Sequence, residues 1–243
     1  MVLFVYLLVG ISSFFLVIVP ISGGIVLNPL LSLIVDPHTA ISVTVFFFMI
    51  NSGIKAIIFR NDIMLKYVIE MLPVSIVAAI IGTYVVGLFS EMFLYVLMFL
   101  MTLFFASKKL FPALFKSSGS VEKTHSGSII TSLMSGFMQG VGLGGGGSLR
   151  KIYFLSNNLS LQQMHGTTSA LSVMLGTVST FIRLETDQVT TEILLPVLYL
   201  IPIMVVSIIY GKKILIKLSD RTSDVIIKIT LSLTLLFVAF KLI

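Results

Sequence analysis

The sequence predicts an all-α integral membrane protein built from two inverted-topology repeats. Of its 243 residues, 57% are hydrophobic and only 11% are charged, and the mean hydropathy is +1.11. A water-soluble domain needs far more charge on its surface. Apolar segments near the roughly 20 residues that span a bilayer recur along the chain. We therefore expect a multi-pass protein of the cell membrane, surrounded by lipid.

The apolar segments form two sets on either side of a polar central stretch. One element in each set is too short to span and follows a glycine-rich break. The first set is expected at Val2–Val19, Ile25–Val35, Thr39–Phe59, Tyr67–Phe89 and Met92–Phe105. The second is expected at Ser128–Leu143, Leu149–Asn157, Met164–Ile182, Glu192–Tyr210 and Asp224–Leu242. This pattern predicts a first repeat over residues 1–111, a cytoplasmic linker over 112–126 and a second repeat over 127–243.

The two sets resemble each other in sequence. An ungapped alignment places Gly23 on Gly147, Leu31 on Leu155, Ser32 on Ser156 and Thr44 on Thr168. After one residue of slippage it places Arg60 on Arg183, Asp62 on Glu185 and Leu72–Val74 on Leu195–Val197. An ordered series of such matches indicates an internal repeat, as in many transporters. We interpret the two Arg and acid pairs as structural groups at helix ends.

The basic residues predict the orientation of the repeats. They gather around three loops, near Lys55 to Lys66, Lys108 to Lys123 and Lys212 to Lys228. The loop near Glu91 has no basic residue, and the loop near Arg183 has one. An odd number of elements per half puts all three basic loops on the cytoplasmic face, as the positive-inside rule requires. The halves are then inverted, and both termini are expected to be extracytoplasmic.

The short elements are expected to form glycine-tipped, re-entrant or broken helical hairpins. Val2–Val19 with Ile25–Val35 would enter from outside, and Ser128–Leu143 with Leu149–Asn157 from the cytoplasm. About three full transmembrane helices would complete each repeat. Non-helical backbone at membrane depth is tolerated only against protein or a water-filled cavity. Two such tips therefore predict a central polar site.

The glycine tips supply the first candidate substrate-binding residues. Glycine lets the backbone approach a ligand closely, and a helix that starts there directs free N–H groups and a positive dipole end at an anion. Arg150 would add charge, and Lys151 is less favoured because neighbouring residues point to different faces. Close helix packing and snorkelling are the alternatives. The candidates are Gly23, Gly24, Gly144, Gly145, Gly146, Gly147, Ser148 and Arg150.

Polar residues within the apolar elements supply the other candidates, because such residues usually face the protein interior. They are Asn28, Thr44 and Asn51 in the first half and His165, Thr167, Thr168 and Ser169 in the second. Hydroxyl groups can bind an oxyanion, but interhelical bonding and capping explain them equally well. His165 could relay protons, although a simple hydrogen bond is the more common role.

Several function classes are excluded by what the sequence lacks. The chain has no cysteine, which removes thiolate catalysis and Cys metal sites. It has no HExxH, GxSxG or Walker A motif and no catalytic constellation. The net charge of +6 comes from residues between apolar runs, which does not indicate nucleic-acid binding. We expect no enzyme activity, no cofactor and no metal.

The glycine tips and the elements after them resemble the TauE/SafE family of sulfite and sulfonate exporter-like permeases. The resemblance rests on Gly142–Leu149 with Gly166–Ser169, and on Gly23–Leu31 with Asp36–Ala40 and Thr44. It implies a secondary permease for a small anion, often sulfur-containing, such as sulfite, a sulfonate or sulfoacetate. Alternating access about a mid-membrane site is the expected mechanism. A coupling proton or ion and a homodimer stay open.

The sequence departs from the family pattern at a few positions. Tyr153 stands opposite Pro29, the first glycine cluster is thin, and Arg150-Lys151 interrupts a stretch that is usually apolar. These departures concern the substrate more than the fold. The alternatives to a coupled transporter are an uncoupled anion channel or facilitator and a membrane assembly subunit without transport activity.

Overall fold

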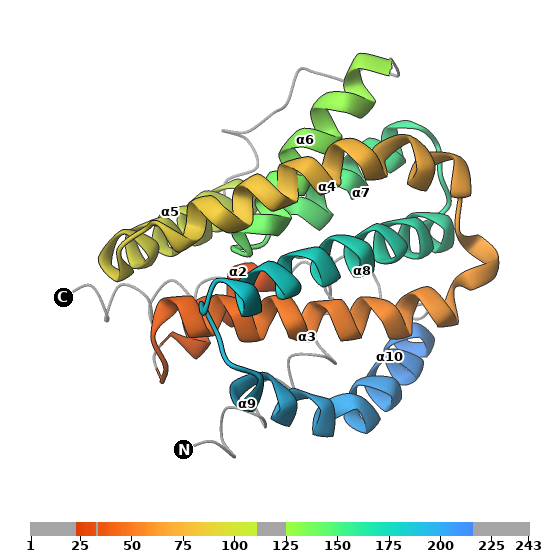
Figure 1. Cartoon of the computed structure of the whole chain (residues 1–243). Coiled ribbons are helices and arrows are strands. Elements are labelled where there is room, and N and C mark those ends of the chain that lie inside the picture. Colours follow the sequence, from red (N-terminus) through yellow and green to blue (C-terminus); the bar gives the residue numbers. More distant parts are fainter. Residues whose placement is uncertain (1–22, 33, 111–124, 216–243) are drawn as a thin grey trace.

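The computed structural model describes residues 23–32, 34–110 and 125–215, and all of its regular elements are helical (Figure 1). The first half contributes α2 (Gly24–Leu31), α3 (Pro37–Ile58), the short 3-10 helix η1 (Arg60–Asp62), α4 (Leu65–Gly87) and α5 (Glu91–Leu110). The second contributes α6 (His125–Val141), α7 (Gly146–Ser156), α8 (Leu161–Glu185), α9 (Thr191–Leu194), the 3-10 helix η2 (Leu195–Leu200) and α10 (Ile201–Leu215). The expected elements Val2–Val19 and Asp224–Leu242 lie outside the described residues, as does most of the linker.

Three stretches of the described chain are long and apolar enough to cross a membrane. They are α3, α4 and Thr191–Gly211, a stretch that runs through α9, η2 and most of α10. The apolar part of α5, Glu91–Phe104, is shorter. The all-helical membrane class predicted from composition therefore holds for the described chain.

The helix starts follow from local sequence. Asp36 caps α3 by accepting a hydrogen bond from the Thr39 N–H at 2.9 Å, and Pro37 occupies the first turn. Ser160 and Gln163 form a reciprocal capping box at the start of α8. Both caps lie in the turns that connect the short helices to the long ones. They fix where the long helices begin, and so which residues face inward.

The expected element Glu192–Tyr210 is not one uninterrupted α-helix. Its first part is α9, and Leu195-Pro196 opens the 3-10 helix η2 before α10 begins. Proline removes a backbone donor and crowds the preceding turn, so a break here is expected physically. The matching proline of the first half, Pro73, lies inside α4, which continues through it.

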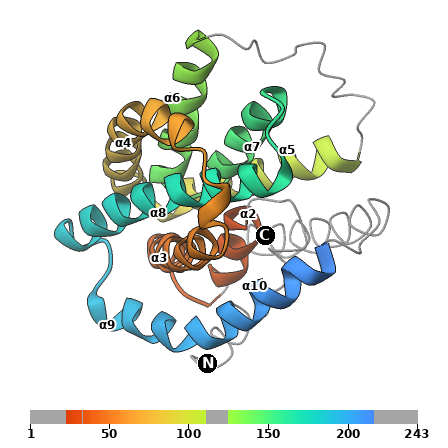
Figure 2. The same cartoon turned by 90° about the vertical axis from the view of Figure 1, so that its right-hand side faces the viewer.

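Helices α3 and α8 form the centre of the described fold and run antiparallel (Figures 1 and 2). At one end the Arg183 Nη1 lies 3.5 Å from the Ser42 hydroxyl oxygen. At the other end the rings of Phe59 and His165 stack with centroids 6.0 Å apart. Helix α8 is too polar to count as a span by composition, but its buried face carries hydroxyl groups along most of its length. It is the polar interior helix of the described chain.

Helices α4 and α6 approach so closely that backbone meets backbone. A Cβ added at Gly140 would lie 2.8 Å from the Ala79 Cα, and one at Gly136 would lie 2.7 Å from the Ser75 Cα. Ser75 donates a hydrogen bond to the Ser132 carbonyl at 3.1 Å across the seam. Small residues spaced four apart allow this kind of packing between membrane helices.

The start of α2 contacts the glycine break of the second half. The non-helical break between α6 and α7 covers Gly142–Gly145, because Gly146 and Gly147 already belong to α7. A Cβ added at Gly24 would lie 3.0 Å from the Gly144 Cα, so only glycine permits this approach. The Asn28 side-chain amide donates to the Gly142 carbonyl at 2.8 Å. The start of α2 is thus held against the break that precedes α7.

Candidate functional site

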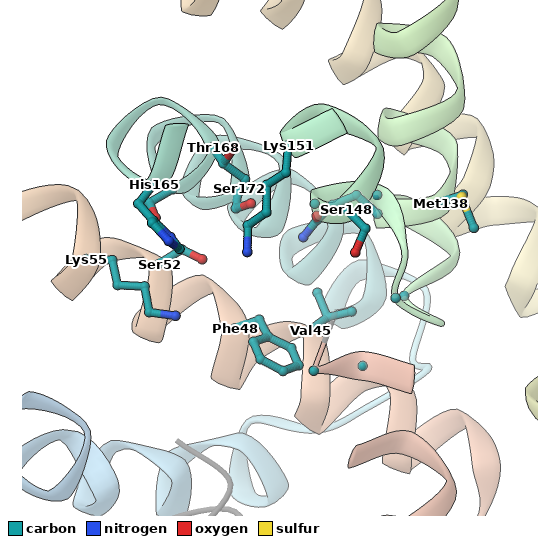
Figure 3. Close-up of a pocket in the computed structure, with 18 residues that line it drawn as sticks. Val45, Phe48, Ser52, Lys55, Met138, Ser148, Lys151, His165, Thr168 and Ser172 are labelled. Carbon is teal, nitrogen blue, oxygen red and sulfur yellow. The ribbon is translucent and has the colours of Figure 1, made fainter. Parts of the chain in front are cut away.

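A cavity of about 110 Å³ lies where α3, α7 and α8 meet the two glycine breaks (Figure 3). A water molecule occupies about 30 Å³, and pockets for drug-sized ligands measure about 300–1,000 Å³. The cavity therefore has the size for a small ion with few atoms. Its lining residues are Gly23, Gly24, Val45, Phe48, Ser52, Lys55, Met138, Gln139, Gly142, Gly144, Gly146, Gly147, Ser148, Lys151, His165, Thr168, Ser169 and Ser172.

The lining follows helical spacing on the long helices. Helix α3 contributes Val45, Phe48, Ser52 and Lys55, which share one face at intervals of three and four residues. Helix α8 contributes His165, Thr168, Ser169 and Ser172 at the same spacing. The cavity thus follows the α3–α8 seam from an apolar part at Val45 and Phe48 to a basic part at Lys55 and His165.

Two helix starts open into the cavity. Helix α2 begins at Gly24 and α7 at Gly146, and neither has a side chain that caps it. The first N–H groups of a helix have no acceptor within it. Gly145 adopts a φ of +93°, a left-handed conformation that a side chain would strain. The two uncapped helix starts therefore direct the positive ends of their dipoles toward the cavity.

The charged groups of the cavity are all basic. Lys55 from α3 and Lys151 from α7 both extend toward the space between the helices (Figure 3). None of the described residues that line the cavity carries a carboxylate. The Thr168 hydroxyl, in a residue only 7% exposed, has no hydrogen-bond partner within the described part of the chain. The lining thus offers cations and hydroxyls to a ligand, but no anion.

Arg150 lies behind the cavity wall and not in it. Its side chain is fully buried, and its Nη2 donates to the Gln139 Oε1 at 3.0 Å and to the Ser172 Oγ at 2.9 Å. A guanidinium can only donate, so Arg150 occupies one acceptor site on each of these two oxygens. The Ser172 O–H and the Gln139 side-chain NH2 remain as donors. Arg150 therefore orients two lining residues toward a ligand that accepts hydrogen bonds.

Arg183 forms a second buried cluster at the far end of α8. It is also fully buried, and its Nη2 donates to the Gly140 and Val141 carbonyls at 2.9 and 3.3 Å. Its Nη1 donates to the Gln188 Oε1 at 2.9 Å. A cation at the last carbonyls of α6 suits the helix dipole. Backbone carbonyls, Gln188 and Ser42 hold the guanidinium of Arg183, whereas its expected partner Glu185 is exposed.

The structure brings many of the predicted site residues together. Those that line the cavity are Gly23, Gly24, Gly144, Gly146, Gly147, Ser148, His165, Thr168 and Ser169. Gly145 lies in the break without lining the cavity. The others, Asn28, Thr44, Asn51, Arg150 and Thr167, are buried beside it. Thr167 accepts a hydrogen bond from the Met64 N–H at 3.0 Å, which gives it a structural partner.

Sequence reasoning missed several lining residues, above all Lys55 and Lys151. Lys55 lies within the expected element Thr39–Phe59 but is counted there with the basic loop that follows, and in the structure it is on α3 and lines the cavity. A lysine inside an apolar run, in register with Ser52 and Phe48, was the available signal. The sequence favours Arg150 over Lys151 as a binding residue, but in the structure Lys151 lines the cavity and Arg150 does not. Ser52, Gln139 and Ser172 carried no distinctive motif.

Comparison with known proteins agrees with these features. A family model described as Sulfite exporter TauE/SafE matches residues 4–242, nearly the whole chain. No curated protein and no solved structure matches the chain. The family is one of membrane transporters and not of enzymes, which fits the apolar helices of the described fold. The chain therefore belongs to the sulfite exporter TauE/SafE family and is a membrane transport protein.

Proposed function

We propose that this protein carries a small sulfur-containing oxyanion, such as sulfite or a sulfonate, across the cell membrane, and that the cavity is its binding site. The observation that carries the proposal is the cavity lining: two lysines, two uncapped helix starts and no carboxylate among the described residues. A cation at membrane depth costs about 2.5–3.5 kcal/mol on insertion scales, so two of them in one cavity imply an anionic ligand. The family match supports the sulfur chemistry.

We further propose that residues 1–111 and 127–243 are inverted repeats and that the site works by alternating access. Helices α3 and α8 occupy equivalent places in the two halves and run antiparallel, as inversion requires. Continuing the ungapped alignment places Val45 on Ser169 and Phe48 on Ser172, and all four line the cavity. A binding site between repeat-equivalent positions supports exchange of access between the two faces. In this arrangement both ends of the sequence lie outside the cytoplasm.

The proposal is tested by flux in proteoliposomes. Purified protein should take up sulfite, and Thr168→Val should raise the KM because it removes an unpartnered hydroxyl at constant volume. Thr177→Val is the matched control, since Thr177 is on α8 but is exposed and donates to the Val173 carbonyl at 2.9 Å. Absence of sulfite flux in the wild type would refute the proposal. Uphill accumulation under an ion gradient separates a coupled transporter from a facilitator, and any flux excludes a purely structural subunit.

A further inference from the structure

The two lysines of the cavity come from different elements and face the same space. Lys55 is on α3 and Lys151 is on α7, and both are half-buried (Figure 3). Lys55 lies in the last turn of α3, which ends at Ile58, and Lys151 lies in the middle of α7, yet both line the cavity. Two like charges that share a cavity repel each other in a medium less polar than water. A nearby negative charge is therefore needed to offset the repulsion between the two ammonium groups.

The described lining supplies no compensation of its own. It contains no carboxylate, and its remaining polar groups are neutral or titratable to a positive charge. A ligand with one negative charge would leave one ammonium group uncompensated. An ion with two negative charges would neutralise both, and Arg150, a third cation behind the cavity wall, adds to the same positive potential. Uncompensated buried charge is strongly unfavourable, so the charge count favours a dianion.

The hydrogen-bonding groups around the lysines also favour a fully ionised oxyanion. Arg150 donates to the oxygens of Ser172 and Gln139, and the hydrogens of these two lining residues are left as donors for a ligand. The Thr168 hydroxyl adds a donor without a partner in the described chain. A fully ionised oxyanion only accepts hydrogen bonds, and it matches such a lining. A protonated anion would also have to donate a hydrogen bond, and no carboxylate in the described lining offers it a charged acceptor.

We infer that the cavity selects a small oxyanion carrying two negative charges, and that Lys55 and Lys151 are the residues that set this selectivity. The inference rests on the proposed function and narrows it. Doubly charged sulfite, sulfate or thiosulfate would be preferred over a sulfonate or the singly protonated form of sulfite. Lys55 and Lys151 contact the ion directly, whereas Arg150 is a positioning residue.

Sulfate and methanesulfonate form a matched pair of probes, because they share a tetrahedral sulfur and differ by one charged oxygen replaced by methyl. Their inhibition constants against sulfite uptake should differ by about tenfold or more in the wild type, in favour of sulfate. Lys55→Gln and Lys151→Gln should each reduce that ratio to about one. Lys55→Arg and Lys151→Arg keep the positive charge, so they should preserve most of the difference between the two inhibition constants. Lys66→Gln is the control, since Lys66 is an exposed lysine of α4 outside the cavity.

The wild-type ratio tests the inference even where a variant fails to fold. Equal inhibition of wild-type uptake by sulfate and methanesulfonate would overturn the inference. A ratio that is unchanged in both glutamine variants would overturn the assignment to Lys55 and Lys151. In either case sulfite uptake would persist and the proposed function would stand. Loss of sulfite uptake by the wild type is the separate result that refutes the proposed function.

Discussion

Gly140→Ala tests whether close backbone contact between α4 and α6 stabilises the fold. The added Cβ would meet the Ala79 carbonyl oxygen and lie 2.8 Å from the Ala79 C and Cα. Carbon atoms pack best at about 3.5–4.0 Å, so the two helices would have to separate by roughly 0.7–1.2 Å. Both contacts are backbone, and backbone cannot rotate away as a side chain can.

The cost of that separation can be estimated from its parts. Overpacking of this kind costs about 1–3 kcal/mol, and alanine in a helix returns up to about 1 kcal/mol relative to glycine. The Gly140 carbonyl also accepts hydrogen bonds from Thr83 at 3.2 Å and from Arg183 at 2.9 Å. Weakening either bond adds about 0.5–1.5 kcal/mol. The net expected loss of stability is about 1–3 kcal/mol.

Thermal unfolding in detergent, followed by circular dichroism, measures this loss in a chain that has no tryptophan or cysteine for other optical probes. We expect the midpoint to fall by roughly 2–12 °C. Gly53→Ala is the control, because its Cβ would lie 3.8 Å from the Val173 Cγ2, an ordinary contact. That variant should be neutral or slightly stabilised. Equal midpoints for the two variants would refute the argument that backbone contact controls the seam.

Three further predictions concern the ends of the cavity and the topology. Arg183→Ala should destabilise the protein by several kcal/mol, because the Val141 carbonyl loses its side-chain donor and the Gly140 carbonyl keeps only Thr83. Arg183→Lys should not restore stability, because an ammonium group cannot replace the guanidinium fork, and equal melting of Arg183→Lys and wild type would contradict this. His165→Gln should retain sulfite binding but lose accumulation driven by a pH gradient if His165 carries the coupling proton, and unchanged accumulation would exclude that role. Cysteines introduced singly at Ser118 and Ser219 should both be labelled from the cytoplasmic face, and labelling from opposite faces would refute the inverted arrangement.

Most of the described helices could be predicted from hydropathy alone, because length and apolar content decide what crosses a bilayer. The expected element Thr39–Phe59 differs from α3 by only a few residues. The largest differences arise where backbone conformation decides the outcome. Helix α7 begins at Gly146, inside the glycine run, and the last described span breaks at Pro196. Neither boundary changes the hydropathy pattern, so neither could be read from it.

The choice between Arg150 and Lys151 shows what the sequence could not supply. The two residues are adjacent on α7, so they point about 100° apart, and only the rotation of the helix decides which one faces the cavity. Gly146 fixes that rotation, because it packs against the Ser135 carbonyl of α6. Gly147 then faces Thr168 across a gap that is open enough for a Cβ, 3.9 Å from the Thr168 Cγ2. Such tertiary contacts have no local signature.

The hydrogen bond from Asn28 to the Gly142 carbonyl has a mechanical consequence for transport. It links α2 of the first half to the glycine break of the second half, beside the cavity. The tie is a neutral bond worth about 0.5–1.5 kcal/mol net, comparable to thermal energy. The start of α2 and the break would therefore move together in small fluctuations. A larger rearrangement would break this hydrogen bond at little cost in free energy. A small displacement of either segment would therefore also shift the other wall of the cavity.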